Sequence, residues 1–461
     1  MRGITCNPRV ASCAALALVA QLQLPPVSAQ SLRSNTLPID LPAALRLAGA
    51  RNLDVQIARD QLKEAQAKRT SALEEFFPWL APGVSYVRRA GLAQAVPAGT
   101  ISAAHFQSYA PGATVAAQMD LGDAIYGALA ARQIATAASH AFQAHRQDAI
   151  LAAARGYFNL AKDKALVGVA QETLRIAQDY RDQLREAVAA GIAFKGDELR
   201  AQSEVERDKI LFERARERQR LDGARLAQIL HLNPSVELIP KASDLVPMTL
   251  VSTDATLNAL VRQALQDRPE LGQGRAVMRA ARDAKDGATY GPLIPTISAQ
   301  YFDGGLGGGP DSGPGRFGRQ SDLFASLTWR IGPGGLFDFG KIHASHARLD
   351  AARAGLEKIH DQISREVVQA WAGVHSLRRQ LATARSNLTA AGETLRLTQQ
   401  RKEFGVGVVL ENIQAQRDLA RARAEYLNTV AKYDKAEYDL NWAIGRRLSS
   451  DRGQSAPALP K

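Results

Sequence analysis

The sequence predicts a mainly α-helical protein with two long helical hairpins and four amphipathic β-strands. Apolar residues recur at alternating steps of four and three from Ile363 to Leu395, which is the period of antiparallel helices packed as a coiled coil. A helix, a glycine-containing tip and a second helix occur twice along the chain. Four further segments of about ten residues alternate apolar and polar side chains, as β-strands with two different faces do.

Glycines mark the tips of the two hairpins. Glycine ends helices because it reaches backbone conformations that other residues avoid. Gly191 and Gly405 lie 214 positions apart, and we expect the tips near residues 191–196 and 405–409. Each glycine is followed six residues later by an acid and ten residues later by alanine, namely Asp197 and Ala201, and Glu411 and Ala415. This duplication predicts two internal structural repeats.

The first 29 residues are expected to form a signal peptide. Arg2 and Arg9 precede an apolar run at residues 11–24, and small residues at 27–29 suit a cleavage site. Both cysteines, Cys6 and Cys13, fall in this segment, so the mature chain carries no thiol. No later stretch reaches 18 apolar residues, so the sequence contains no helical membrane span.

Two repeats and a connector organise the remaining chain. The predicted parts are a first repeat at 30–232, a connector with short strands or turns at 233–255, a second repeat at 256–445 and a disordered tail at 446–461. Each repeat should contain a helix, a strand pair and a hairpin. Pro78 and Pro295 end the two opening helices, which begin at Leu41 and Leu257, because proline disfavours a helical residue before it.

The predicted strands lie at about 79–88, 112–121, 295–302 and 321–331. In the last of these, Leu323, Ala325 and Leu327 alternate with polar or aromatic residues. Strands of this length and pattern suit a tilted crossing of an outer membrane, with the apolar face toward lipid. Half-buried strands of a soluble sheet have the same pattern and remain an alternative.

Loops are expected between the strands of each pair. The first runs over 88–111, and the second, 303–320, is rich in glycine and proline and should be exposed and mobile. Neither its glycines nor those at 332–335 fit a phosphate-binding fingerprint. We expect 332–335 to turn the last strand into the following helix.

Few residues could carry chemistry. His343, His346 and Asp350 share one helix face with a spacing that could hold a metal, although polar residues on a wet helix face are the simpler interpretation. No catalytic motif or cofactor site stands out. The formal charge of +12 is spread along helix faces and mixed with acids, which favours solvated helices over a nucleic-acid surface. A membrane conduit and a secreted coiled-coil scaffold or tether therefore both remain open.

The order and duplication of these parts resemble the TolC-like outer-membrane efflux proteins. The most specific segments are 191–201, 401–415 and the LFDFGK sequence at 336–341, and the resemblance covers about 41–445. It implies a homotrimer with four strands per protomer, closing a 12-stranded barrel in outer-membrane lipid above a long periplasmic α-helical barrel. It also implies a Gram-negative outer membrane, a periplasmic adaptor (membrane fusion) protein and an inner-membrane RND, ABC or MFS transporter as partners. The channel itself would be no enzyme.

The resemblance assigns roles to residues near the tips. It places Glu411 at the periplasmic entrance, where Gln414 occupies the position of a second acid found in some members. An exposed Glu411 paired with Arg417 or another helix charge is the alternative. The hairpin tips would be the adaptor-docking surface, with the candidate residues Gly191, Phe194, Asp197, Gly405, Val406 and Val408. Neither the cargo nor the particular pump follows from the sequence.

Overall fold

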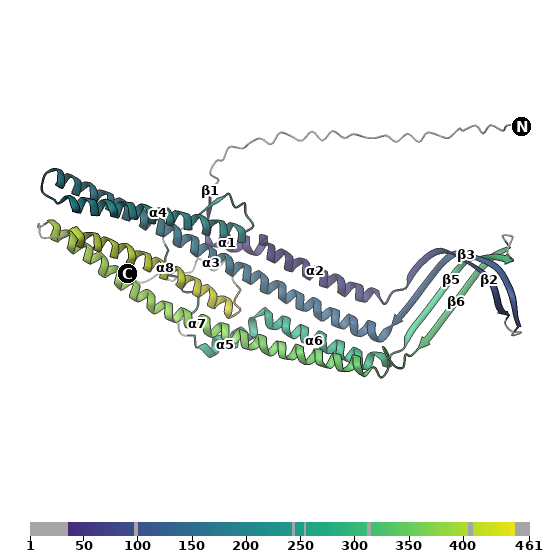
Figure 1. Ribbon diagram of the computed structural model, residues 1–461. Helices are drawn as coiled ribbons and strands as arrows, with labels where there is room; N and C mark the ends of the chain where they lie inside the picture. Colours follow the sequence, from purple (N-terminus) through teal and green to yellow (C-terminus); the bar gives the residue numbers. More distant parts are fainter. Residues whose placement is uncertain are drawn as a thin grey trace, which may run out of the picture. The chain divides into compact units, whose positions relative to one another are not determined.

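The computed structural model describes residues 36–95, 100–241, 245–252, 255–310, 315–403 and 409–447, and the chain from Thr36 onward forms one compact unit (Figure 1). The predicted signal peptide, most of the predicted tail and the tip residues Gly405, Val406 and Val408 lie outside the described residues. The helices are α1 (Leu41–Arg51), α2 (Leu53–Glu74), α3 (Leu121–Ala189), α4 (Lys195–Ile229), α5 (Leu257–Asp267), α6 (Pro269–Tyr290), α7 (Phe339–Glu403) and α8 (Val409–Ala443), with a 3-10 turn at Gly291–Leu293. The strands are β1 (Thr36–Ile39), β2 (Trp79–Ala95), β3 (Thr100–Asp120), β4 (Glu237–Pro240), β5 (Thr296–Pro310) and β6 (Arg316–Thr328).

Four of the strands form one antiparallel sheet in the order β2-β3-β5-β6. The strands are longer than predicted. β2 continues past residue 88 to Ala95, and β3 begins at Thr100 rather than at 112. β5 continues to Pro310, and β6 begins at Arg316 and ends at Thr328 instead of 331. The expectation that 88–111 and 303–320 are loops was therefore wrong.

Glycines in β5 explain why this segment has no obvious strand pattern. A Cβ atom on Gly307 would lie 2.3 Å from Cζ of Tyr109, and one on Gly305 would lie 2.2 Å from Cζ of Phe317. The two rings therefore occupy the space that side chains on β5 would need. Tyr109 and Phe317 stack over Gly307 with centroids 6.0 Å apart and planes 11° from parallel. Glycine in a strand commonly marks such a close approach, so the run is structured by its neighbours.

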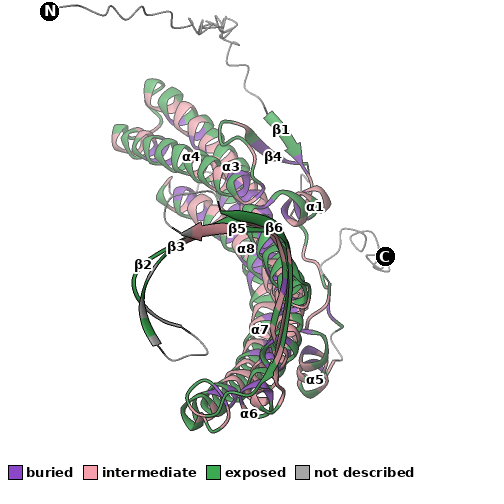
Figure 2. Cartoon of the chain, turned by 90° about the vertical axis from the view of Figure 1, so that its right-hand side faces the viewer, coloured by how far each residue is buried: buried purple, intermediate pink, exposed green. Residues whose placement is uncertain are grey.

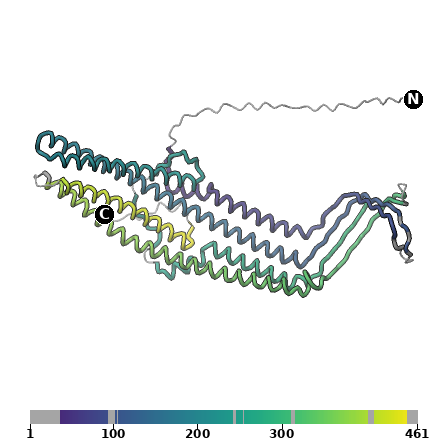
Figure 3. Tube along the Cα trace, in the orientation of Figure 1, coloured from purple at the N-terminus to yellow at the C-terminus, as the bar shows by residue number. Residues whose placement is uncertain are grey.

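The helices pack side by side in two stretches. Near the strands, α2, α3, α6 and α7 are neighbours, and toward the tips α3 and α7 pack with α4 and α8 (Figure 3). α3 has 69 residues, which corresponds to about 100 Å of helix. The predicted seam on α7 is confirmed, since Ile363, Val367 and Val374 are at most 2% exposed. Over the described part of the chain, none of the helices combines the length and apolar character needed to cross a membrane.

The helices that were predicted to run from 41 to 77 and from 257 to 294 are each interrupted. Asn52 separates α1 from α2 because its Oδ1 accepts from the backbone N–H of Asp54 at 2.9 Å, while its Nδ2 donates to the carbonyl of Ile229 at 2.9 Å. Arg268 separates α5 from α6 ahead of a proline, and its guanidinium donates to the carbonyl of Ala443 at 3.4 Å. Each interruption thus lies against the C-terminal end of a hairpin helix.

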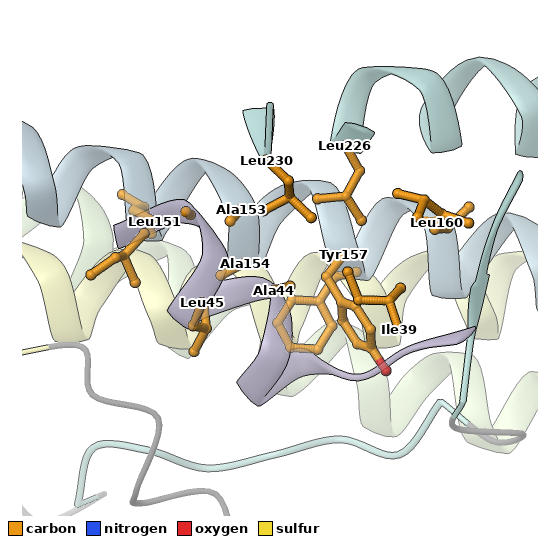
Figure 4. Packing of buried hydrophobic residues seen from close by; sticks show 14 of the residues in the cluster. Ile39, Ala44, Leu45, Leu151, Ala153, Ala154, Tyr157, Leu160, Leu226 and Leu230 are labelled. Carbon is orange, nitrogen blue, oxygen red and sulfur yellow. The ribbon is translucent and has the colours of Figure 1, made fainter. Parts of the chain in front are cut away.

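A hydrophobic core surrounds the first interruption (Figure 4). Leu160, Leu226 and Leu230 are fully buried between α3 and α4, and Tyr157 closes the cluster toward β1. β1, which the sequence analysis missed, pairs in parallel with β4 some 200 residues later. Figure 2 shows that buried residues follow the helix contacts, whereas β2 and β6 are largely exposed.

The segment after β4 is fastened to α8 by two buried carboxylates. Asp434 and Glu437 are both 0% exposed. Oδ1 of Asp434 accepts from the backbone N–H of Met248 at 2.8 Å, and Oε2 of Glu437 accepts from those of Leu250 at 3.0 Å and Val251 at 3.2 Å. Carboxylates can thus hold a segment that has no secondary structure of its own.

Candidate channel entrance, hairpin tips and sheet face

The first hairpin tip is a tight turn at the predicted glycine. Gly191 has a φ of +74°, a conformation that favours glycine. The backbone N–H of Ile192 donates to the carbonyl of Ala187 at 2.9 Å, which closes the end of α3 in the manner of a glycine-containing helix cap. The polypeptide then enters α4 within a few residues, so the two helices are antiparallel neighbours.

Apolar side chains project from this tip. Phe194 is 72% exposed and Ile192 is 83% exposed. A Cβ atom on Gly196 would lie 2.3 Å from Cε1 of Phe194, so this glycine leaves room for the ring beside the first turn of α4. Asp197, in that same turn, accepts from Nη1 of Arg200 at 2.9 Å.

A small core holds the two hairpins together close to their tips. It consists of Tyr180 and Leu184 on α3, Ala201 on α4 and Ile413 on α8, with Val409 packed against it. Burial raises the pKa of Tyr180 to about 12, and Asp197 adds to this increase. The repeated alanine positions predicted from the sequence are both buried, with Ala201 2% and Ala415 4% exposed.

Glu411 and Gln414 lie in the first turns of α8. Glu411 is 40% exposed at its side chain, and its Oε1 accepts from Nη1 of Arg401 at 2.8 Å. Gln414 is exposed and its Nε2 donates to Asp418 at 3.1 Å. Within one protomer Glu411 thus pairs with a charge on α7, which is the kind of contact that the alternative interpretation envisaged, although the partner is Arg401 and not Arg417.

Arg417 instead makes a contact that the sequence analysis missed. Its Nε donates to Oε1 of Glu204 at 2.8 Å, and its Nη2 donates to the other oxygen of the same carboxylate. Glu204 has only 7% of its side chain exposed, and Arg207 also contacts it. This pair joins α4 to α8 beside a groove of about 530 Å³ that Asp208 also lines. Because the partners are 213 residues apart, no local spacing could have indicated the pair.

The predicted metal-ligand candidates do not gather into a cluster. Across the residues that the structure describes, no three His, Cys, Asp or Glu side chains lie together as a metal site would require. On the helix face that carries His343 and His346, Asp350 accepts from Nη1 of Arg353 at 2.9 Å.

Strand register assigns each side chain of the four-stranded sheet to one of two faces, because directly paired residues lie on the same face. One face, called the apolar face below, carries exposed large hydrophobic residues from every strand, namely Leu80, Val84, Val115, Tyr301, Leu323 and Leu327. The other, the polar face, carries mainly hydroxyl, amide and small side chains, including Thr114, Gln118, Ser298, Gln300, Asp322 and Ser326.

An aromatic row crosses the apolar face. Tyr86 is the partner of Tyr109, which is the partner of Gly307, which in turn is the partner of Phe317. Trp329 directly follows the last residue of β6 near the helices, and its Nε1 donates to the carbonyl of Leu293 at 3.2 Å. Between these two levels the face is mainly apolar, with one ion pair between Arg319 and Asp303. Aromatic residues at both ends of a mainly apolar band are typical of a surface that spans a membrane.

A match to a protein-family model establishes the family of this chain. The sequence model of the outer membrane efflux proteins matches residues 44–230 and again 260–446. The chain belongs to the outer membrane efflux protein family. Together the two matches cover both hairpins and all four strands of the sheet.

Similar proteins include efflux components. The toluene efflux pump outer membrane protein TtgC of Pseudomonas putida is 25% identical over 315 residues, which is 66% of this chain and 62% of TtgC. Outer membrane protein OprJ of Pseudomonas aeruginosa is 28% identical over 312 residues, which is 64% of this chain and 62% of OprJ. The chain therefore matches less than two thirds of the length of these relatives.

Solved structures share the fold of this family member. A membrane protein from Pseudomonas aeruginosa superimposes with a TM-score of 0.75 at 22% identity, covering 89% of this chain and 95% of that one. The CmeC outer membrane channel of Campylobacter jejuni gives a TM-score of 0.73 at 17% identity, with 88% and 85% covered. The predicted fold class, mainly α-helical with four strands in one sheet, is confirmed.

Proposed function

We propose that this family member is an outer-membrane channel that works as a passive conduit for efflux or type I secretion. Three copies would close one 12-stranded barrel, and their helices would form a periplasmic tunnel. An inner-membrane transporter of the RND, ABC or MFS type would supply the energy through a periplasmic adaptor. The chain would then need neither a cofactor nor catalytic residues, and it would lie in the outer membrane of a Gram-negative bacterium.

The two faces of the sheet carry this proposal. From Trp329 to Phe317 the chain advances twelve residues, which gives a height of about 30 Å at about 3.3 Å per residue and a tilt of about 40°. That height matches the hydrocarbon core of a membrane. β2 and β6 are unpaired at the edges of the described sheet. Open edges are unfavourable in lipid, and this supports closure into a barrel, in which β6 would pair with β2 of another copy.

The proposal is tested by purification and by electrical recording. The full chain should require detergent for extraction from membranes, should migrate as a trimer and should form channels in planar lipid bilayers. A coiled-coil scaffold or tether, the competing function, would be a soluble protein without conductance. A water-soluble monomer that forms no channels would exclude the conduit.

Glu411 is proposed as an entrance residue of this assembly of three copies. Threefold symmetry would bring three Glu411 carboxylates around one axis, where a narrow space would favour cations. Its pairing with Arg401 at 2.8 Å lowers the free negative charge within one protomer, so the entrance role requires that this pair opens or stays partly solvated.

The exposed tips are proposed as the adaptor-docking surface. Phe194 is 72% exposed and therefore does not pack in a core of this chain, and a partner helix could bury its ring. Gly405, Val406 and Val408 would supply the corresponding surface of the second tip. Contact with a neighbouring copy of the chain is the alternative use of these side chains.

A further inference from the structure

The end of the sheet farthest from the helices carries unbalanced positive charge. We call this end the outer mouth and define it as the strand residues beyond the Tyr86–Tyr109–Phe317 row, which are 87–95, 100–108, 308–310 and 316. These segments contain Arg88, Arg89 and Arg316 and no Asp or Glu. The connecting sequences 96–99 and 311–314 add a single acid, Asp311. Three arginines against one acid leave a positive excess in each chain.

Strand register places the arginines on different faces. Arg89 is the partner of Phe106, and its guanidinium carbon lies 5.6 Å from the centre of that ring. Arg316 is the partner of Gly308, and through the register it shares the face of Arg89. Both therefore belong to the polar face, the face that also carries Asp322. Arg88, one residue before Arg89, belongs to the apolar face.

The two polar-face arginines are free of nearby negative charge among the described residues. Both side chains are exposed, and neither forms an ion pair with a described residue. Asp322 lies six residues from Arg316 along β6, which is about 20 Å, and its carboxylate already accepts from Nε2 of Gln320 at 2.5 Å. That separation exceeds the Debye length of about 10 Å at 0.1 M salt, so Asp322 cannot neutralise the mouth.

We propose that Arg89 and Arg316 form an anion-binding ring at the outer mouth, which holds phosphate- or carboxylate-bearing solutes as they leave the channel. This inference rests on the proposed function, because it requires three copies with the polar face turned toward the lumen. Three copies bring six guanidinium groups to one opening. Guanidinium presents a planar fork that matches phosphate and carboxylate oxygens, and rings of arginine favour anions in pores. The contact with Phe106 holds the Arg89 side chain against β3 and leaves its positive charge unneutralised.

Single-channel recording with tripolyphosphate on the extracellular side tests this ring. The parent channel should be blocked, and the double variant Arg89→Gln/Arg316→Gln should need at least about tenfold more tripolyphosphate, since six charges are removed from the opening. Arg88→Gln is the matched control, because it removes the neighbouring arginine from the opposite face, and its block should change by less than about twofold. Raising KCl from about 0.1 M to about 1 M should weaken the parent's block, because the Debye length falls from about 10 Å to about 3 Å.

Two further variants keep the result interpretable. Arg89→Lys/Arg316→Lys retains the charge and should retain most of the block, and Arg316→Gln alone should give an intermediate block. Equal block in the parent, in Arg316→Gln and in Arg89→Gln/Arg316→Gln would overturn the ring. A loss of block in Arg88→Gln as large as in the double Gln variant would also overturn it. Failure of the parent chain to form any channel would instead contradict the proposed function.

Discussion

Replacing Asp434 by asparagine should remove much of the pH dependence of folding stability that results from burial of this carboxyl group. The Asp434 side chain is fully buried on α8. Burial raises its pKa from 3.8 to about 7, the hydrogen bond from the Met248 backbone opposes the increase, and the nearby Glu437 adds to it. The folded protein therefore keeps a proton on Asp434 at pH values at which the unfolded chain has lost it.

The sign follows from linkage. A carboxyl group whose pKa is higher in the folded state favours folding fully below its unfolded pKa of about 4, and this advantage is lost as pH rises through about 7. An increase of about 3 units at about 1.4 kcal/mol each gives an upper limit of about 4 kcal/mol. Asp163, whose pKa burial raises to about 6, contributes with the same sign. Stability should therefore be greater at pH 5 than at pH 8.

Thermal unfolding of the detergent-solubilised protein, followed by far-UV circular dichroism at pH 5 and pH 8, measures this effect. Asp434→Asn keeps an oxygen that can accept from Met248. Between pH 5 and pH 8 about 3 kcal/mol of the upper limit is lost, so the variant should reduce the difference in apparent Tm by about 3 to 5 °C, at about 1 to 2 °C per kcal/mol for a chain of this size. Asp439→Asn is the control, because Asp439 lies on the same helix but pairs with Arg155 near the surface. Greater parent stability at pH 8, or identical pH differences in the two variants, would refute the reasoning.

Three other outcomes are expected. Gly307→Val should lower the heat stability of the protein because its side chain would displace the stacked rings. Gly318→Val, with nothing within 4 Å of its Cβ position, should change the heat stability little, and equal effects would argue against the ring support. In single-channel recordings with divalent cations on the periplasmic side, Glu411→Gln should weaken cation block strongly and Asp197→Asn only slightly; unchanged block in both would make Glu411 a surface residue. Phe194→Glu should abolish export through the proposed channel in cells and leave the proposed trimer intact by gel migration and heat stability, whereas loss of the trimer would indicate packing between copies of the chain.

The helical hairpins could be predicted because their information is local. The seam on α7 lies within one continuous segment, and Gly191 marks the tip from a single position, so periodicity and glycine chemistry were enough. The strand ends could not be predicted in the same way. Gly305 and Gly307 belong to a strand because rings from β3 and β6 cover them, and that information lies in other parts of the chain.

Long-range partners limited the prediction of the site as well. β1 is too short to show a pattern of its own and needs β4 beside it. Arg417 could be identified from the sequence as a charge close to Glu411 on α8, but its pairing with Glu204 on α4 depends on how the two hairpins pack. The acid Glu411 was found by its distance from the tip glycine, whereas its partner Arg401 requires the geometry of the helix pair.

The interruptions at Asn52 and Arg268 make the length of the protein modular. At Asn52, α2 begins where α4 ends, and α3 continues past both helices. At Arg268, α6 begins where α8 ends, and α7 continues past both helices. Inserting one heptad into each arm of a hairpin would therefore move its tip by about 10 Å and leave every residue on the strand side in register. A protein with this fold could in this way place its tips at a different distance from the sheet while keeping the same strand part.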